Sequence, residues 1–210
     1  LYLVNGHIVQ RVTTAIWIGK LLLIIFMLIK NLNDAIHYHQ KVFDKRWCDN
    51  LVKYADLVCV NKGKTVEKKD NKSRKVFTYP FSNNKQDTLY KAWIFSRTSE
   101  ILKFYLAEYK SINNLKILDV EMLKYNDGFF FKTHIDDSIK TPRTLSIIIN
   151  LNDNYIGGEL YFTSQDHKDI TKIYELKRGD VIIFPSNFLY PHGIMPIIKG
   201  TRYSIITWLK

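Results

Sequence analysis

The sequence predicts an α+β fold, in which two helices precede a run of short strands. Two amphipathic patterns in the first half indicate the helices, and strand-like segments separated by turn residues fill the second half from Ile117 onward. Short strands at such spacing are typical of a β-sandwich or barrel. The chain has 210 residues and 46% hydrophobic content, which fits one globular domain with a substantial core.

The first helix is predicted from Phe43 to Val58, where apolar side chains recur at three- and four-residue intervals and Asp44 lies near the start. The second is predicted from about Thr88 to Tyr109. Its apolar side is expected to consist of Trp93, Ile101, Leu102, Tyr105 and Leu106.

The segment between these helices is predicted to be mostly loop, with one short strand at Lys75–Tyr79, because it is polar and contains Gly63 and Pro80. Its basic run, KGKTVEKKDNKSRK, is interpreted as a solvated loop, since no aromatic residue interrupts it to stack on bases. The formal net charge of +11 fits an anionic partner and fits diffuse surface lysine equally well.

Strands are predicted in the segments ILDVEML, FFFKTHID, TLSIIINL, GELYFT, IYELK, DVIIFP and TRYSIITWL. Alternate residues of a strand point to opposite sides, so the side chains that face a cavity can be separated from those that face the core. The core face of the third segment is predicted to carry Leu145, Ile147, Ile149 and Leu151. The cavity faces are predicted to carry Ser146, Ile148, Asn150 and Asn152; Phe130, Lys132, His134 and Asp136; and Arg202, Ser204, Ile206 and Trp208. Phe131 and its alternate neighbours are assigned to the opposite face of their strand.

One ordered set of residues carries the chemistry. His134 and Asp136 stand at i and i+2 of a strand and can hold one metal ion together. A distant His192 completes two imidazoles and a carboxylate, which is the ligand set of non-heme Fe(II) oxygenases with open coordination positions. Arg202 follows on the next strand and is suited to bind a dicarboxylate in a bidentate fork. An H-x-D pair alone occurs by chance, whereas the complete ordered set is specific.

The stretches YNDGFFFKTHIDD, RTLSIIINLNDNYIGGELYF and GDVIIFPSNFLYPHGIMPIIKGTRYSIITWLK resemble the Fe(II)/2-oxoglutarate-dependent dioxygenases, and within them the prolyl 4-hydroxylase-like branch. The resemblance covers about Ile117–Lys210. It implies a double-stranded β-helix (jelly-roll) core with N-terminal packing helices. It also implies that the iron ligands are His134, Asp136 and His192.

The same resemblance implies a 2-oxoglutarate pocket in which Arg202 pairs with the distal carboxylate. Ser204, on the same strand face, and Tyr125, ahead of the H-x-D pair, are expected to line this pocket. Asn150 stands where many prolyl hydroxylases have a tyrosine whose hydroxyl meets that carboxylate. An asparagine can donate the same hydrogen bond but has a shorter reach.

The activity implied by the resemblance is hydroxylation of an unactivated C–H bond, with a prolyl residue of a peptide or protein as the leading substrate. The reaction would use Fe(II), 2-oxoglutarate and O2, with ascorbate as a candidate reductant, and release succinate and CO2. Three alternatives stay open: a hydroxylase of a free amino acid or other small molecule, an AlkB-type nucleic-acid demethylase, and a non-catalytic jelly-roll binding module. Trp208 stands where AlkB-type enzymes carry a second arginine, which disfavours nucleic acid as substrate. The complete ligand set argues against the binding module.

Residues 1–30 are predicted to form a separate apolar segment, and residues 31–210 the dioxygenase domain. Val12–Ile29 is nearly long enough to cross a bilayer, so a membrane anchor through residues 12–29 stays open beside a cytoplasmic location. The first methionine is Met27, so whether residues 1–26 belong to the natural protein also stays open. The sequence makes no prediction of the oligomeric state.

A helical pattern lies between the two cysteines, Cys48 and Cys59, which places them about 16 Å apart along the axis at 1.5 Å per residue. That separation is too long for a disulfide. The sequence therefore predicts two thiols and favours a reducing compartment.

Overall fold

The computed structural model describes residues 32–59, 73–112 and 115–210, which fall into two compact units. In the first unit, which ends at Ala35, the described part is a single 3-10 helix, η1 (Leu32–Ala35). The second unit runs from Ile36 to Lys210. No helix of the described residues has the length and apolarity to span a membrane. The predicted apolar segment, including residues 12–29, and most of the basic run lie outside the described residues, so the predicted domain boundary stays a prediction.

Two long helices lie in the first half of this unit. Helix α2 (Lys45–Val58) begins after Asp44, whose side chain accepts a hydrogen bond of 2.8 Å from the backbone N–H of Trp47. Helix α3 (Lys85–Glu108) begins after Asn84, whose side chain accepts a hydrogen bond of 2.8 Å from the N–H of Asp87. Both predicted helices are therefore confirmed, and α3 begins a little earlier than expected.

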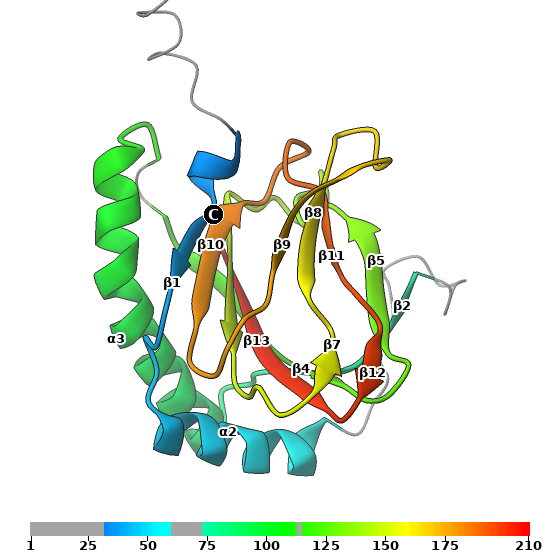
Figure 1. Ribbon diagram of the computed structural model, residues 1–210. Coiled ribbons are helices and arrows are strands. Elements are labelled where there is room, and N and C mark those ends of the chain that lie inside the picture. The colour runs from blue at the N-terminus through cyan, green and yellow to red at the C-terminus, as the bar shows by residue number, and fades with distance from the viewer. Residues whose placement is uncertain (1–31, 60–72, 113–114) are drawn as a thin grey trace, which may run out of the picture. The chain divides into compact units, whose positions relative to one another are not determined.

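The strands form two larger antiparallel sheets and a short ribbon (Figure 1). The six-stranded sheet has the order β1 (His37–His39), β10 (Val181–Pro185), β6 (Leu145–Asn150), β13 (Arg202–Leu209), β4 (Ile117–Tyr125) and β3 (Phe77–Pro80). The five-stranded sheet has the order β2 (Arg74–Lys75), β5 (Phe130–His134), β11 (His192–Ile194), β8 (Leu160–Thr163) and β9 (Ile170–Tyr174). The ribbon pairs β12 (Ile197–Lys199) with β7 (Ile156–Gly157).

The main core lies between the two helices and one face of the six-stranded sheet. Helix α2 contributes Trp47, Cys48, Leu51 and Ala55, and α3 contributes Ile94 and Tyr105. The sheet contributes the whole predicted core face of β6, which consists of Leu145, Ile147, Ile149 and Leu151. The alternation of residues along the strand therefore predicted the core face of β6 correctly. The helices occupy one side of this sheet and leave its other side to the cavity described below (Figure 1).

The buried side of α3 includes Tyr105, Ile101 and Leu102, as predicted, but not Trp93. Trp93 is 39% exposed, with the Arg97 guanidinium carbon 5.0 Å from its ring centroid, whereas Ile94 and Tyr105 are fully buried. At about 100° per residue, Trp93 lies about 120° around the helix from Tyr105, and Ile94 lies only about 20° from it. The prediction for Trp93 was wrong because it followed the large apolar side chain and not the position of Trp93 around the helix.

Several strands were not predicted. His37-Tyr38-His39 pairs with Val181–Ile183 of β10 as the edge strand β1. Strands β7, β11 and β12 are only two or three residues long. Such lengths carry no readable alternation, and pairing with a neighbour defines them. Cys48 and Cys59 are buried, unpaired thiols, as predicted.

Candidate active site

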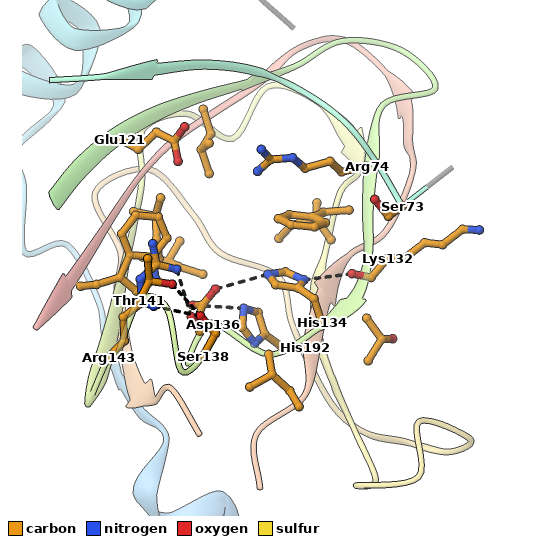
Figure 2. Close-up of a pocket in the computed structure, with 18 of the residues that line it drawn as sticks. Ser73, Arg74, Glu121, Lys132, His134, Asp136, Ser138, Thr141, Arg143 and His192 are labelled. Carbon is orange, nitrogen blue, oxygen red and sulfur yellow. Dashed lines mark hydrogen bonds and ion pairs between the residues drawn. The ribbon is translucent and has the colours of Figure 1, made fainter. Parts of the chain in front are cut away.

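Three side chains that could hold one metal ion meet at one end of the five-stranded sheet. His134 ends β5, His192 begins β11, and the two residues face each other in the antiparallel register. Asp136 follows β5 by two residues. One ligand atom from each of the three residues lies within 4.8 Å of the other two (Figure 2). The structure thus brings together the three residues that the sequence predicts as iron ligands.

Both imidazoles present the same nitrogen to the centre of this cluster. The Nδ1 atoms lie 2.9 Å from the carbonyl oxygen of Lys132, for His134, and 3.1 Å from that of Tyr190, for His192. The Nε2 atoms lie 3.4 Å (His134) and 3.6 Å (His192) from the two carboxylate oxygens of Asp136. A backbone carbonyl on the far nitrogen orients the ring and makes it a better ligand, as is usual for metal-binding histidines.

The carboxylate of Asp136 is held by a chain of hydroxyl groups. Ser146 of β6 donates a hydrogen bond of 2.7 Å from Oγ to Asp136 Oδ2, and the hydroxyls of Ser146 and Ser186 lie 2.8 Å apart. Burial by itself raises the pKa of Asp136, but its interactions with His192, His134 and Ser146 lower that pKa well below its ordinary value. The group is therefore an anion at neutral pH.

His192 is only 3% exposed. This burial, together with the nearby His134, lowers the pKa of His192 to about 4. Its imidazole is therefore neutral at neutral pH, which is the state that coordinates a metal. Two imidazoles and one carboxylate form the donor set that Fe(II) oxygenases use, so the residues present fit this metal.

Phe131 contacts the cluster, against the prediction from strand alternation. Its ring stacks on that of His134, with 3.6 Å between centroids and 11° between planes. The pairing of β5 with β11 shifts register between His192 and Ile194, so that Ile194 lies opposite Phe131. A register shift changes which side chains share a face. The assignment of Phe131 to the opposite face was therefore wrong.

Arg202 is the candidate anion-binding group of the site. It begins β13, is 1% exposed, and donates a hydrogen bond of 3.0 Å from a guanidinium nitrogen to Ser204 Oγ. Its Nε and second terminal nitrogen are buried and have no hydrogen-bond partner among the described residues. Burying a guanidinium without an acceptor costs free energy, so this side chain is built to receive an anion. The arginine therefore fits a carboxylate of 2-oxoglutarate, as the donor set fits Fe(II).

Tyr125 lies beside this arginine. The ring of Tyr125, which is 1% exposed, is centred 5.5 Å from the guanidinium carbon of Arg202. Burial raises the pKa of Tyr125 to about 12, so its hydroxyl is a neutral hydrogen-bonding group at neutral pH. The structure thus places Tyr125, Arg202 and Ser204 together, as the sequence predicts.

One cavity of about 1020 Å³ joins the cluster to this arginine. Its lining includes the three candidate ligands, Tyr125, the predicted face of β13 (Arg202, Ser204, Ile206 and Trp208), and Ile148. Asn150 is absent from the lining. Its side-chain nitrogen lies 2.6 Å from the carbonyl oxygen of Asn152 and 3.0 Å from that of Leu176, both of which accept its hydrogen bonds. Asn150 thus pairs with Ser204 across β6 and β13, but its side chain does not line the cavity.

Other cavity residues escaped the sequence reasoning. Arg143 donates to the carbonyl oxygen of Asp136 at 3.1 Å, and its guanidinium carbon lies 3.6 Å from the ring centroid of Trp208. Glu121 and Arg74 line a part of the cavity away from the cluster (Figure 2). These three residues lie on loops or distant strands, and no local pattern connects them to the ligands. Ser146, predicted on the cavity face of β6, does not line the cavity and instead donates a hydrogen bond to Asp136.

The chain was compared with known protein families and curated proteins. Residues 120–210 match the family model of the 2OG-Fe(II) oxygenase superfamily. A PKHD-type hydroxylase of Idiomarina loihiensis is 26% identical over 99 residues, which cover 45% of this chain and 43% of that protein. Human prolyl 3-hydroxylase 2 is 37% identical over 68 residues, which cover 32% of this chain and 10% of that protein. The chain therefore spans less than half the length of these relatives.

Solved structures share the fold. A prolyl hydroxylase of Trichoplax adhaerens, solved with a peptide fragment of the oxygen degradation domain of hypoxia inducible factor, aligns with a TM-score of 0.68 at 15% identity, over 83% of each chain. A prolyl-4-hydroxylase of Pseudomonas putida aligns with a TM-score of 0.63 at 16% identity, over 84% of this chain and 92% of that one. The predicted α+β fold with a double-stranded β-helix core is confirmed.

The family match begins in β4 and ends at the last residue, so it contains all three candidate ligands and Arg202. The relatives found in sequence and in structure are hydroxylases of the PKHD and prolyl types. The family implies Fe(II), 2-oxoglutarate and O2, and the donor set described above fits them. Residues 120–210, which make up less than half of the chain, are thus similar to the 2OG-Fe(II) oxygenase superfamily.

Proposed function

We propose that this protein is an Fe(II)- and 2-oxoglutarate-dependent dioxygenase that hydroxylates a prolyl residue of a peptide or protein. His134, Asp136 and His192 are proposed to hold the iron, and Arg202, with Ser204 and Tyr125, the co-substrate. The prolyl substrate is proposed because the relatives are prolyl and PKHD-type hydroxylases. We place the catalytic domain at residues 31–210 and the activity in the reducing cytoplasm, since both cysteines are thiols.

One observation carries this proposal. A single cavity contains both a two-histidine, one-carboxylate cluster and a buried arginine with two unpartnered nitrogens. The cluster suits a metal ion with open coordination positions, and the arginine suits a carboxylate. A co-substrate with a metal-chelating end and a distal carboxylate satisfies both requirements at once.

The residues of the chain position and shield the reaction. Bound Fe(II), 2-oxoglutarate and O2 would supply the chemistry, with release of succinate and CO2 and hydroxylation of a C–H bond. Ser146 and the carbonyl oxygens of Lys132 and Tyr190 orient the three ligands. Arg202 fixes the orientation of the co-substrate from a buried position. The apolar lining, such as Ile148 and Ile206, excludes water from the reacting groups.

The test is an anaerobic titration of the metal-free protein with Fe(II) and 2-oxoglutarate, followed by its visible charge-transfer absorption. We expect a band that saturates at one equivalent and needs both additions. Arg202→Ala removes charge-assisted hydrogen bonds to the co-substrate, so its affinity for 2-oxoglutarate should fall by about 10- to 100-fold. His192→Ala should abolish the band and succinate release while the circular dichroism spectrum is kept.

Arg97→Ala is the matched control, because Arg97 lies on α3 against Trp93 and outside the cavity. It should bind 2-oxoglutarate with unchanged affinity. A folded protein that gives no band with both additions would exclude the oxygenase assignment. Full turnover in His192→Ala would remove this residue from the metal site.

A further inference from the structure

We propose that the mouth of the active-site cavity selects acidic peptides, so that the prolyl substrate carries aspartate or glutamate beside the reacting residue. This inference rests on the proposed function, because it names the substrate class of the same site. The distribution of charge around the cavity supports it.

The cavity lining outside the proposed metal and co-substrate sites is mostly cationic. The basic side chains there are Arg74, Lys132, Lys140 and Arg143, and the single acidic one is Glu121. Burial raises the pKa of Glu121, and this one carboxylate cannot balance the four basic side chains. The imbalance therefore favours an anionic ligand.

Two of these cations lie at the solvent-exposed edge of the cavity. Lys132 is on β5 and Lys140 is on the loop between β5 and β6, and both side chains are exposed. In Figure 2 the side chain of Lys132 extends away from the metal-ligand cluster. Within the described part of the chain, neither ammonium group has a carboxylate within ion-pair distance, whereas Lys124 lies 2.6 Å from Asp56. These two charges remain available to a ligand.

The nearest other carboxylate of that loop is already engaged. Asp137 accepts a hydrogen bond of 2.9 Å from the backbone N–H of Arg143, which turns its side chain toward the loop itself. Asp137 is not among the residues that line the cavity. An incoming acidic side chain would therefore meet Lys132 and Lys140 with little opposing charge.

The aromatic side chains of the cavity favour a peptide over a nucleic acid. Base recognition by stacking needs an open aromatic face. Here Trp208 is covered by the guanidinium of Arg143, Phe131 by His134, and Tyr125 is buried. A cationic edge without an open stacking platform suits aspartate and glutamate side chains on an extended peptide.

The experiment measures the binding of three fluorescein-labelled nonapeptides to the full chain, kept anaerobic with Fe(II) and 2-oxoglutarate so that no turnover occurs. Each peptide has a central proline, and the four positions flanking it are Asp/Glu, Asn/Gln or Lys. We expect the acidic peptide to bind most tightly by fluorescence anisotropy. The difference in affinity between the acidic peptide and the other two should shrink when the salt concentration rises from about 0.01 M to about 0.3 M. The reason is that the screening length falls from about 30 Å to well under 10 Å.

Lys132→Gln and Lys140→Gln should each weaken binding of the acidic peptide by about twofold to fivefold at low salt, and leave the Asn/Gln peptide nearly unaffected. The double charge reversal Lys132→Glu/Lys140→Glu should make the Lys peptide the tighter ligand. The matched control is Lys103→Gln on the exposed side of α3, which changes the net charge equally. It should leave the preference for the acidic peptide unchanged.

Equal affinity for the three peptides, or an equal effect of Lys103→Gln, would overturn the inference. So would a single-stranded oligonucleotide of equal charge that binds more tightly than the acidic peptide and displaces it. A missing charge-transfer band with a preserved peptide preference would contradict the oxygenase assignment alone. Succinate release that is equally fast with all three peptides would contradict the acidic substrate alone.

Discussion

At the scale of single residues, each ligand of the proposed metal site depends on a partner that holds it. Asp136 shows this dependence most clearly, because it is 8% exposed and accepts a hydrogen bond from the hydroxyl of Ser146. Ser146 is itself fully buried and lies 2.8 Å from the hydroxyl of Ser186. The hydroxyl chain thus orients the carboxylate without occupying the side that faces the histidines.

Replacing Ser146 tests this positioning role. Ser146→Ala removes the hydrogen bond to Asp136, and we expect the affinity for Fe(II) to fall by about 10- to 100-fold, the usual effect of losing a residue that supports a metal ligand. Anaerobic titration of the charge-transfer band measures it. Ser99→Ala is the control, because Ser99 is exposed on α3 and bonds only a backbone carbonyl. Unchanged iron affinity in Ser146→Ala would show that Asp136 needs no such support.

At the scale of elements, the site requires β11 to approach β5 closely. Gly193 follows His192, and a Cβ atom placed there would lie 2.5 Å from Tyr161 Oη and 2.6 Å from the carbonyl oxygen of Phe131. The absence of a side chain lets the two strands pair where His134 and His192 meet. Sequence inspection marks this glycine only as part of a short Pro-His-Gly segment.

A methyl group at this position should disturb both stability and metal binding. Gly193→Ala overpacks the strand pair, so we expect a loss of about 1–3 kcal/mol in the free energy of unfolding, together with weaker Fe(II) binding. Urea denaturation and the iron titration measure the two effects. Gly128→Ala is the comparison, because its φ of 70° is strained for alanine while the space around it is open. It should lose about 1 kcal/mol and bind iron normally.

The start of α3 is organised around a buried carboxylate. Asp87 accepts hydrogen bonds from Tyr54 Oη at 2.6 Å, Tyr79 Oη at 2.8 Å and Ser82 at 2.8 Å, and so ties α2 and β3 to this helix. Burial by itself raises the pKa of Asp87, but the hydrogen bonds from Tyr54 and Ser82 outweigh it and lower that pKa. The sequence pattern identifies a helix here but not this network, because its partners come from three separate elements.

Asp87→Ala should lower the free energy of unfolding by about 2–4 kcal/mol, since it leaves several buried donors without an acceptor. Because the folded pKa lies below the unfolded value, this contribution is complete above the unfolded pKa and is lost as pH falls through the folded one. The stability difference between the wild type and Asp87→Ala should therefore narrow in acid. Urea denaturation at neutral and acidic pH measures it, with the exposed Asp127→Asn as a control that changes little. A difference that widens in acid would contradict the assigned charge state.

At the scale of the whole molecule, the reactivity of the two cysteines measures how tightly the main core is packed. Cys48 and Cys59 are buried and unpaired on the side of α2 that faces the six-stranded sheet. Burial raises the pKa of each thiol to about 12. Neither thiol is therefore an accessible nucleophile in the folded protein.

Thiol labelling tests this packing. At pH 8 the native chain should react with a thiol reagent only slowly, at a rate set by unfolding, and both cysteines should react at once in guanidinium chloride. Tm should not change when a reducing agent is added, because there is no disulfide to break. Rapid labelling of the native chain would show that the core around α2 opens readily. Leu57→Ala, an exposed position on the same helix, should leave the labelling rate unchanged.

The sequence by itself determined the local features of this protein. Periodicity identified both helices and the core face of β6, and the spacing of His134 and Asp136 placed two ligands on one side of a strand. Those features depend only on repeats of 3.6 and 2 residues along the chain. They sufficed to predict the fold class.

Only the tertiary structure decided what meets across the sheets. It brought Ser146 to Asp136 and kept the side chain of Asn150 out of the cavity. It also shifted the register of β5 against β11, so that Phe131 stacks on His134. These outcomes depend on strand register and side-chain packing between segments far apart in the chain. No local period encodes them, because each is set by the partner that the fold supplies.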